Sequence, residues 1–131
     1  MNIGLIGDNS KKQLIKNLCV AYSGILRKHD LYATEGTGRL IENFRNLKIQ
    51  KLKTGEINAL NDFSVMIEQN SIDALIFLID PDEPNTAHRS YHRIFRACDR
   101  YNVPYASNLG TAELLIQGIA RGDLEWREFY K

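Results

Sequence analysis

The stretch "DALIFLID", residues 73–80, decides how this chain is expected to fold. Its apolar residues follow one another without the alternation of apolar and polar side chains that a half-exposed strand shows. Such a run is typical of a strand that is covered on both faces, at the centre of a parallel sheet. Because parallel strands need a crossover between them, usually a helix, we expect helical segments on either side of this stretch.

Strand-like and helix-like segments alternate along the rest of the chain. Four further segments predict strands, at 3–6, 30–34, 47–52 and 103–107. Apolar residues at helical spacing predict helices over about 11–27, 38–45 and 58–69, one around 94–98, and one that begins near 110 and ends at 122. This alternation predicts an α/β fold in one domain, residues 1–131, with a doubly wound, mostly parallel five-stranded sheet and helices on both faces.

The composition is that of an ordinary globular domain. The 131 residues are 44% hydrophobic and 25% charged, with a net charge of +1. No global basic field favours a nucleic-acid polymer. The apolar run at the N-terminus is too short for a signal peptide or a membrane span. We therefore expect a cytoplasmic protein in which both cysteines, Cys19 and Cys98, are reduced and buried.

Polar loops follow each of the predicted strands. They are Asp8-Asn9-Ser10, Thr34 to Gly38, Thr54-Gly55, Asp80-Pro81 and Ser107 to Thr111. In doubly wound sheets, ligands bind outside the carboxyl ends of the strands. We therefore expect these loops to share one rim of the sheet and to form a ligand site there.

The second of these loops belongs to the stretch "LYATEGTG", residues 31–38. Hydroxyl groups and unshielded backbone N–H groups at the start of a helix bind phosphate. Thr34, Gly36, Thr37 and Gly38 would provide them, and Lys12 would add a positive charge. The alternative is a plain turn in which Thr37 caps a helix and the glycines only permit the backbone to turn.

Several stretches carry a resemblance to a known family. They are "IGLIGDNSKK" (3–12), "HDLYATEGTG" (29–38), "TGEIN" (54–58), "IDALIFLIDP" (72–81) and "CDRYNVPYASNLGTAELLIQGIARGDLEW" (98–126). Through them the chain resembles the methylglyoxal synthase family. The resemblance implies the same fold, usually in homohexamers, and proton abstraction and elimination that convert dihydroxyacetone phosphate to methylglyoxal and phosphate. Related domains bind nucleotides or other phosphorylated ligands on the same rim.

The rim and the resemblance together predict a set of residues that bind a phosphorylated ligand. The set is Asp8, Asn9, Lys12, Thr34, Gly36, Thr37, Gly38, Thr54, Gly55, Asp80, Arg89, Ser107 and Asn108. Gly36 stands where the synthases have a hydroxyl residue, so we expect extra space there for a ligand larger than a triose. No cofactor is predicted. His88 and His92 have a metal-compatible spacing, but no third ligand accompanies them, so no metal site is predicted either.

The catalytic half of the family pattern is largely missing. Proton abstraction needs a base at the substrate carbon and a group that polarises the carbonyl. By resemblance, Leu60 stands at the position of the carboxylate base and Ala87 at that of the polarising histidine. Ser90 replaces a supporting carboxylate, and Asp8-Asn9 replaces a His-Asp pair. We therefore expect no synthase activity.

Three functional hypotheses remain. The first is a non-catalytic protein that binds a phosphorylated small molecule, with nucleotides and nucleotide signals among the candidates, for sensing, sequestration or regulation. The second is an active synthase with a relocated base, for which the candidates are Glu56, Asp62 and Asp80. The third is an interaction subunit of a synthase oligomer. A homo-oligomer, hexamer or trimer, is expected from the resemblance.

A basic strip beside the rim also has two interpretations. Arg89, Arg93 and Arg96 with Tyr91 form either a solvated helix face or a clamp for a second phosphate or a nucleotide base. His88, one residue from the expected histidine, is a further candidate for compensation.

Overall fold

A computed structural model describes residues 1–42, 44–82 and 88–130 of the chain, and for 88–90 it describes the backbone only. Its five-stranded sheet has the order β3-β2-β1-β4-β5, and every pairing is parallel. The strands are β1 (Asn2–Gly7), β2 (Asp30–Thr34), β3 (Ile49–Leu52), β4 (Ala74–Leu78) and β5 (Tyr105–Ala106). The predicted fold class is confirmed. The core of the hydrophobic stretch 73–80 forms β4, next to the central strand β1.

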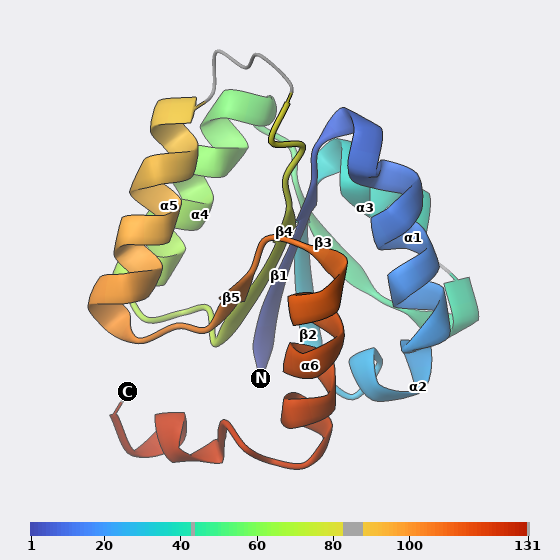
Figure 1. Cartoon of the computed structure of the whole chain (residues 1–131), viewed down its shortest axis with the longest axis vertical. Coiled ribbons are helices and arrows are strands. Elements are labelled where there is room, and N and C mark those ends of the chain that lie inside the picture. Colours follow the sequence, from blue (N-terminus) through green and yellow to red (C-terminus); the bar gives the residue numbers. More distant parts are fainter. Residues whose placement is uncertain (43, 83–87, 131) are drawn as a thin grey trace.

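Helices cover both faces of this sheet (Figure 1). One face carries α1 (Lys12–Ala21), α2 (Ser23–Leu26), α3 (Glu35–Ile41) and α6 (Leu109–Ala120). The other carries α4 (Glu56–Glu68) and α5 (His88–Tyr101). Three 3₁₀ segments complete the description: η1 (Asn9–Lys11), η2 (Phe44–Asn46) and η3 (Glu125–Tyr130).

The two faces explain why β4 is hydrophobic throughout. Its residues contribute alternately to two separate cores: Ile76 and Leu78 to the core under α1 and α6, Leu75 and Phe77 to the core under α4 and α5. Every residue of β4 is buried, because a strand covered on both sides has no polar face.

Each core also contains one cysteine. Cys19 lies in the first core and Cys98 in the second, and both are free thiols. Burial raises the pKa of each thiol to about 12. Both side chains therefore act as small apolar core residues.

Two predicted helices have different bounds in the structure. The helix predicted over 11–27 is interrupted at Tyr22, which separates α1 from α2. The helix predicted from 38 begins already at Glu35, so Gly36 and Gly38 lie within α3 rather than in a loop. The loop before α3 is consequently absent, and β2 leads directly into the helix at Thr34.

A buried ion pair joins η3 to the amino end of β4. Arg127 Nε lies 3.3 Å from Asp73 Oδ1, and the two side chains are 2% and 0% exposed. The same guanidinium donates to Asn70 Oδ1 at 2.7 Å and to the Asn102 carbonyl at 2.7 Å. The Asn2 backbone N–H donates to the other Asp73 oxygen, so this group ties the last segment to the sheet. Among the described residues, no helix has the length and hydrophobicity that a membrane crossing would need.

Candidate functional site

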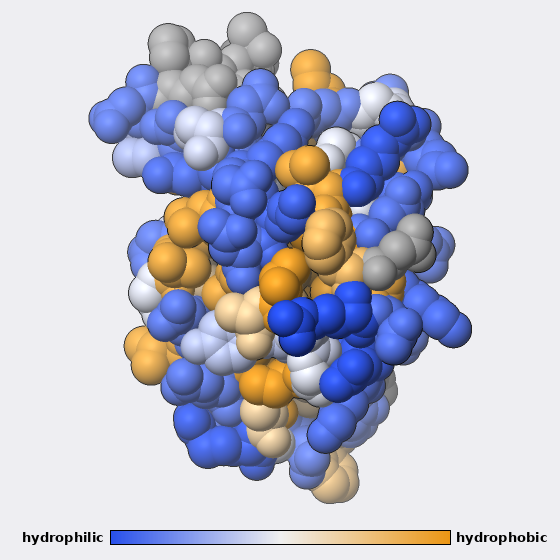
Figure 2. All heavy atoms as spheres, turned by 90° about the vertical axis from the view of Figure 1, so that its right-hand side faces the viewer, coloured by the Kyte–Doolittle hydropathy of each residue, from blue (hydrophilic) through white to orange (hydrophobic). Residues whose placement is uncertain are grey.

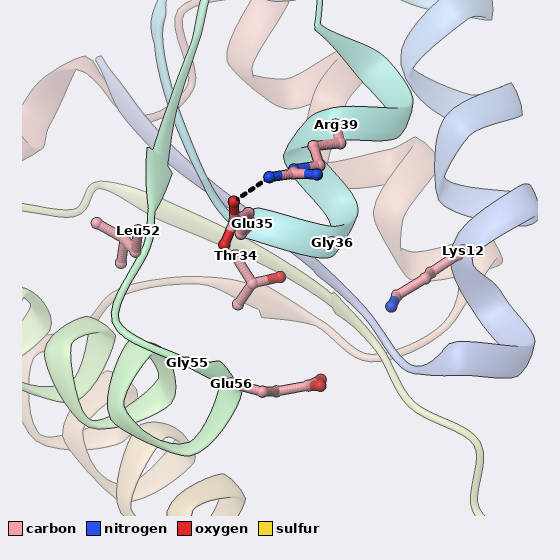
Figure 3. A pocket seen from close by; sticks show the side chains of 8 residues that line it. All are labelled: Lys12, Thr34, Glu35, Gly36, Arg39, Leu52, Gly55 and Glu56. Carbon is pink, nitrogen blue, oxygen red and sulfur yellow. Dashed lines mark hydrogen bonds and ion pairs between the residues drawn. The ribbon is translucent and has the colours of Figure 1, made fainter.

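A pocket of about 380 Å³ opens at the carboxyl ends of β2 and β3, and we call it the rim pocket. It is bounded by the start of α1, the first turns of α3 and the start of α4 (Figure 3). Its lining residues are Lys12, Thr34, Glu35, Gly36, Arg39, Leu52, Gly55 and Glu56. The volume lies within the range that small-molecule sites have. Four of the predicted ligand residues are thus together: Lys12, Thr34, Gly36 and Gly55.

Lys12 lies directly against Gly36. A Cβ atom at position 36 would be 2.8 Å from the Lys12 ammonium nitrogen, closer than real contacts allow. The glycine therefore lets the ammonium approach the first turn of α3. The extra space expected at Gly36 is already occupied, by this ammonium group. Lys12 forms no ion pair with any side chain in the described part of the chain.

The two threonines of the glycine-rich stretch have different positions. Thr34 precedes α3 and lines the rim pocket. Thr37 is fully buried, and its Oγ1 accepts hydrogen bonds from the Gly7 N–H and the Thr34 hydroxyl, both at 3.2 Å. Thr37 thus joins α3 to β1 and does not line the pocket. It is not the cap of α3 either, because the capping position is Thr34.

Gly38, the last predicted residue of that stretch, is also outside the pocket lining. A Cβ atom there would lie 2.5 Å from Cγ of Lys51, so the glycine makes room for the lysine stem. Lys51 in turn pairs with Glu42 at 2.5 Å. The role of Gly38 is therefore to pack α3 against β3.

The pocket wall carries charges of both signs. Arg39 pairs with Glu35 four residues earlier on α3, at 2.6 Å. Glu56 is exposed at the start of α4. Figure 3 shows Glu56 and Lys12 extending into the same space from opposite sides, with the Thr34 hydroxyl turned toward it as well. The Lys12 ammonium and the Glu56 carboxylate therefore face one another across the pocket.

Glu35, Arg39 and Leu52 line the pocket although the sequence reasoning did not select them. A signal existed for the first two. Glu35 and Arg39 are four residues apart, the spacing of an ion pair on a helix. The turn-like composition of residues 35–38 hides this signal, because it favours a loop, in which the spacing has no meaning.

The first loop of the rim has a structural role at Asp8. This carboxylate is 4% exposed. One oxygen accepts the Asp80 backbone N–H at 2.7 Å, and the other accepts the Tyr91 hydroxyl. Asp8 therefore connects the ends of β1 and β4 with α5. Asp80 accepts the Ser10 hydroxyl at 2.7 Å, while Asn9 is exposed in η1; neither lines the rim pocket.

Thr54, Ser107 and Asn108, the remaining predicted ligand residues, are not in the lining of the rim pocket. Thr54 donates its hydroxyl to Asp62 at 2.9 Å. Asn108 caps α6, since its side chain accepts the Thr111 N–H at 3.0 Å. The Ser107 carbonyl accepts the Ile79 N–H at 3.2 Å.

One residue of the basic strip predicted on α5, Tyr91, is not at the surface. Tyr91 is only 7% exposed and packs edge-on against Phe77, with ring centroids 4.7 Å apart, because α5 turns this side chain toward the core. Arg93 pairs with Glu68 at 3.2 Å. Together with Arg96 it lines a different hollow, of about 310 Å³.

Some sequence-based assignments fall outside the described residues. They concern Ala87 and the side chains of His88, Arg89 and Ser90. In the parts of the chain that are described, no three His, Cys, Asp or Glu side chains are grouped so that they could hold a metal ion.

Leu60, which the resemblance assigns to the position of the family's base, is part of the core. It is 1% exposed and belongs to the cluster under α4 and α5. Of the three candidates for a relocated base, Glu56 lines the rim pocket, whereas Asp62 and Asp80 do not.

Comparisons with known proteins give consistent matches. The model of the MGS-like domain family matches residues 15–107. Methylglyoxal synthase of Caldicellulosiruptor saccharolyticus is 42% identical over 128 residues, which are 98% of this chain and 91% of that relative. For methylglyoxal synthase of Alkaliphilus metalliredigens the identity is 38% over 131 residues, 100% of this chain and 98% of the relative. The crystal structure of methylglyoxal synthase from Elizabethkingia anophelis NUHP1 matches with a TM-score of 0.75 and 28% identity, over 88% of this chain and 76% of that one.

Proposed function

Because the chain belongs to the family of MGS-like domains, we propose that it binds a phosphorylated small molecule in the rim pocket without performing the synthase reaction. Leu60 is the observation that carries this proposal. Its aliphatic side chain is 1% exposed within an apolar core, so it neither accepts a proton nor contacts a ligand. A general base typically contributes a factor of about 10² to 10⁴ to the rate. Biological roles that fit are sensing, sequestration and regulation, and nucleotides belong to the ligand class.

The phosphate would be held by Lys12 and by backbone N–H groups around Gly36 and Gly55, with Thr34 in the pocket wall between them. The Lys12 ammonium is the lining cation that lacks an ion pair within the described residues, and it lies over the first turn of α3. The Thr34 hydroxyl is turned toward the space that Lys12 enters (Figure 3), and its proton is donated to Thr37. A charged hydrogen bond contributes about 1.5–3 kcal/mol, so Lys12 would contribute most of the binding free energy of a phosphate.

Calorimetric titration with inorganic phosphate, sugar phosphates and nucleotides tests this binding site. Lys12→Ala is expected to weaken binding of the best ligand by about ten- to a hundredfold. The matched control is Lys16→Ala, since Lys16 is on the same helix but lies over the Phe44 ring at 4.6 Å. Equal affinities in the unmodified chain and in Lys12→Ala would contradict the proposed site.

A second candidate function is a synthase with Glu56 as its base. It is supported by the position of this carboxylate in the pocket wall, opposite Lys12. The proposed loss of chemistry predicts no methylglyoxal from dihydroxyacetone phosphate above the rate in buffer. Turnover that Glu56→Gln abolishes and Asp62→Asn preserves would favour the second candidate instead.

We also propose a homo-oligomer, trimer or hexamer, in the cytoplasm. Large apolar side chains are exposed on α6 and η3, among them Leu114 at 71%, Phe129 at 86% and Trp126 at 43%. Figure 2 shows further apolar surface in a central band on the side that lies to the right in Figure 1. Association would remove such surface from water. Light scattering at micromolar concentration tests this, and a monomer would contradict it. Co-purification with an authentic synthase would favour the interaction-subunit hypothesis.

A further inference from the structure

The charged residues that line the rim pocket limit which phosphorylated ligands fit there. Arg39 and Lys12 are the cations of its wall, and Glu35 and Glu56 are the carboxylates. The 2.6 Å pair between Arg39 and Glu35 leaves Lys12 as the lining cation without an ion pair among the described residues. This single cation offsets only part of the charge of one phosphate monoester, about −1.5 to −2 at pH 7, and the described lining residues offer no second unpaired cation for another phosphate.

Glu56 determines what the opposite side of the pocket accepts. Its carboxylate extends from the first turn of α4 toward the space that Lys12 enters from α1 (Figure 3). An ionised carboxylate only accepts hydrogen bonds, so it favours hydroxyl or amino groups and repels a second phosphate. The pocket volume of about 380 Å³ leaves room for a ligand that reaches both sides.

We propose that the rim pocket selects a monophosphate of a hydroxyl-bearing compound, a sugar or polyol phosphate, and rejects its bisphosphate, with Glu56 as the residue that discriminates. This inference rests on the proposed function, since it assumes that the phosphate binds at Lys12. The ester phosphate lies at Lys12 and Gly36, and the hydroxyl groups donate to Glu56. A second phosphate on the far end meets the same carboxylate and loses affinity.

Calorimetry with matched ligand pairs tests the selection. The pairs are fructose 6-phosphate with fructose 1,6-bisphosphate, and ribose 5-phosphate with ribose 1,5-bisphosphate. The tightest monophosphate is expected to bind at least about tenfold better than its partner, since each charged hydrogen bond contributes a factor of about ten to a hundred. In Glu56→Gln, which keeps the shape and removes the charge, this ratio falls by about tenfold.

The control variant is Glu68→Gln. It makes the same change of charge at the opposite end of α4, where Glu68 pairs with Arg93 at 3.2 Å, so the ratio stays as in the unmodified chain. Titration with inorganic phosphate distinguishes a failure of the proposed selection from a failure of the proposed function. If phosphate binds and Lys12→Ala weakens it, but mono- and bisphosphates bind equally, the selection is refuted while the proposed function stands. If neither phosphate nor any ligand of the panel binds, both are refuted.

Discussion

Replacing Leu60 by aspartate restores the carboxylate that the family's base position is expected to hold, and we expect it to unfold the protein before it restores chemistry. Leu60 is 1% exposed and packs in the core that also contains Phe63 and Phe77. Truncating a buried leucine typically costs about 2–5 kcal/mol. An unpaired carboxylate in the same place adds the cost of its desolvation. Because a domain has about 5–15 kcal/mol of stability in total, Leu60→Asp should lose most of it.

Two further variants separate the causes. Leu60→Ala removes packing alone, and we expect it to lose about 2–5 kcal/mol. Leu60→Asn has nearly the shape of the aspartate variant without its charge. The difference between the asparagine and aspartate variants therefore measures the charge. Urea unfolding followed by circular dichroism gives the free energy of unfolding of all three.

The charge effect has a predictable pH dependence. Burial raises the pKa of a carboxyl introduced at position 60 above its value in the unfolded chain. The extra destabilisation of Leu60→Asp over Leu60→Asn is therefore absent at pH values below the unfolded pKa, where the carboxyl is neutral in both states. It grows as the pH rises from the unfolded pKa to the folded pKa, and it is constant above the folded pKa, where the carboxyl is ionised in both states. If the free energy of unfolding of Leu60→Asp at neutral pH is within about 1 kcal/mol of that of the unmodified chain, the side chain reaches solvent. That result would refute the reasoning about a lost base position.

Three other substitutions or reactions test the rest of the structure. Arg127→Met removes the buried cation that pairs with the Asp73 carboxylate, and should cost about 3–5 kcal/mol in urea unfolding. The double variant with Asp73→Asn should recover part of this loss, and additive losses would contradict the pairing. Burial raises the pKa of Cys19 and Cys98 to about 12, so the folded protein contains almost no thiolate at pH 8. Both cysteines should therefore react with Ellman's reagent only in denaturant, and fast labelling of the native protein would contradict this. Gly36→Ala places a methyl group 2.8 Å from the Lys12 ammonium nitrogen. We expect calorimetry to show severalfold weaker binding of inorganic phosphate, while the free energy of unfolding changes by less than about 1 kcal/mol. Unchanged binding would show that this contact is unimportant.

Local sequence patterns sufficed for the existence of the strands and helices. The apolar run of β4 predicted a strand covered on both faces, and its residues do divide between two cores. Such patterns are informative because burial acts on each residue of an element with the period of that element. The same reasoning selected Lys12, Thr34, Gly36 and Gly55, which line one pocket, because loops that follow parallel strands lie on one edge of the sheet.

Local patterns failed where a long-range contact overrides a local preference. Residues 35–38 have the composition of a turn, yet they form the first turn of α3. Thr37 is held there by the Gly7 N–H of β1, thirty residues away in the chain. Tyr91 was assigned to an exposed strip, but its hydroxyl reaches Asp8 and its ring contacts Phe77 in the core.

The sequence by itself determined the fold class and selected four residues of the rim pocket, because these depend on periodicity and on the chemistry of single side chains. The tertiary structure decided which charges share the rim pocket. The sheet order β3-β2-β1-β4-β5 brings Lys12 of α1, the Glu35–Arg39 pair of α3 and Glu56 of α4 around one cavity. No local pattern contains that order, because strand pairing is set by contacts between segments that are far apart in the chain.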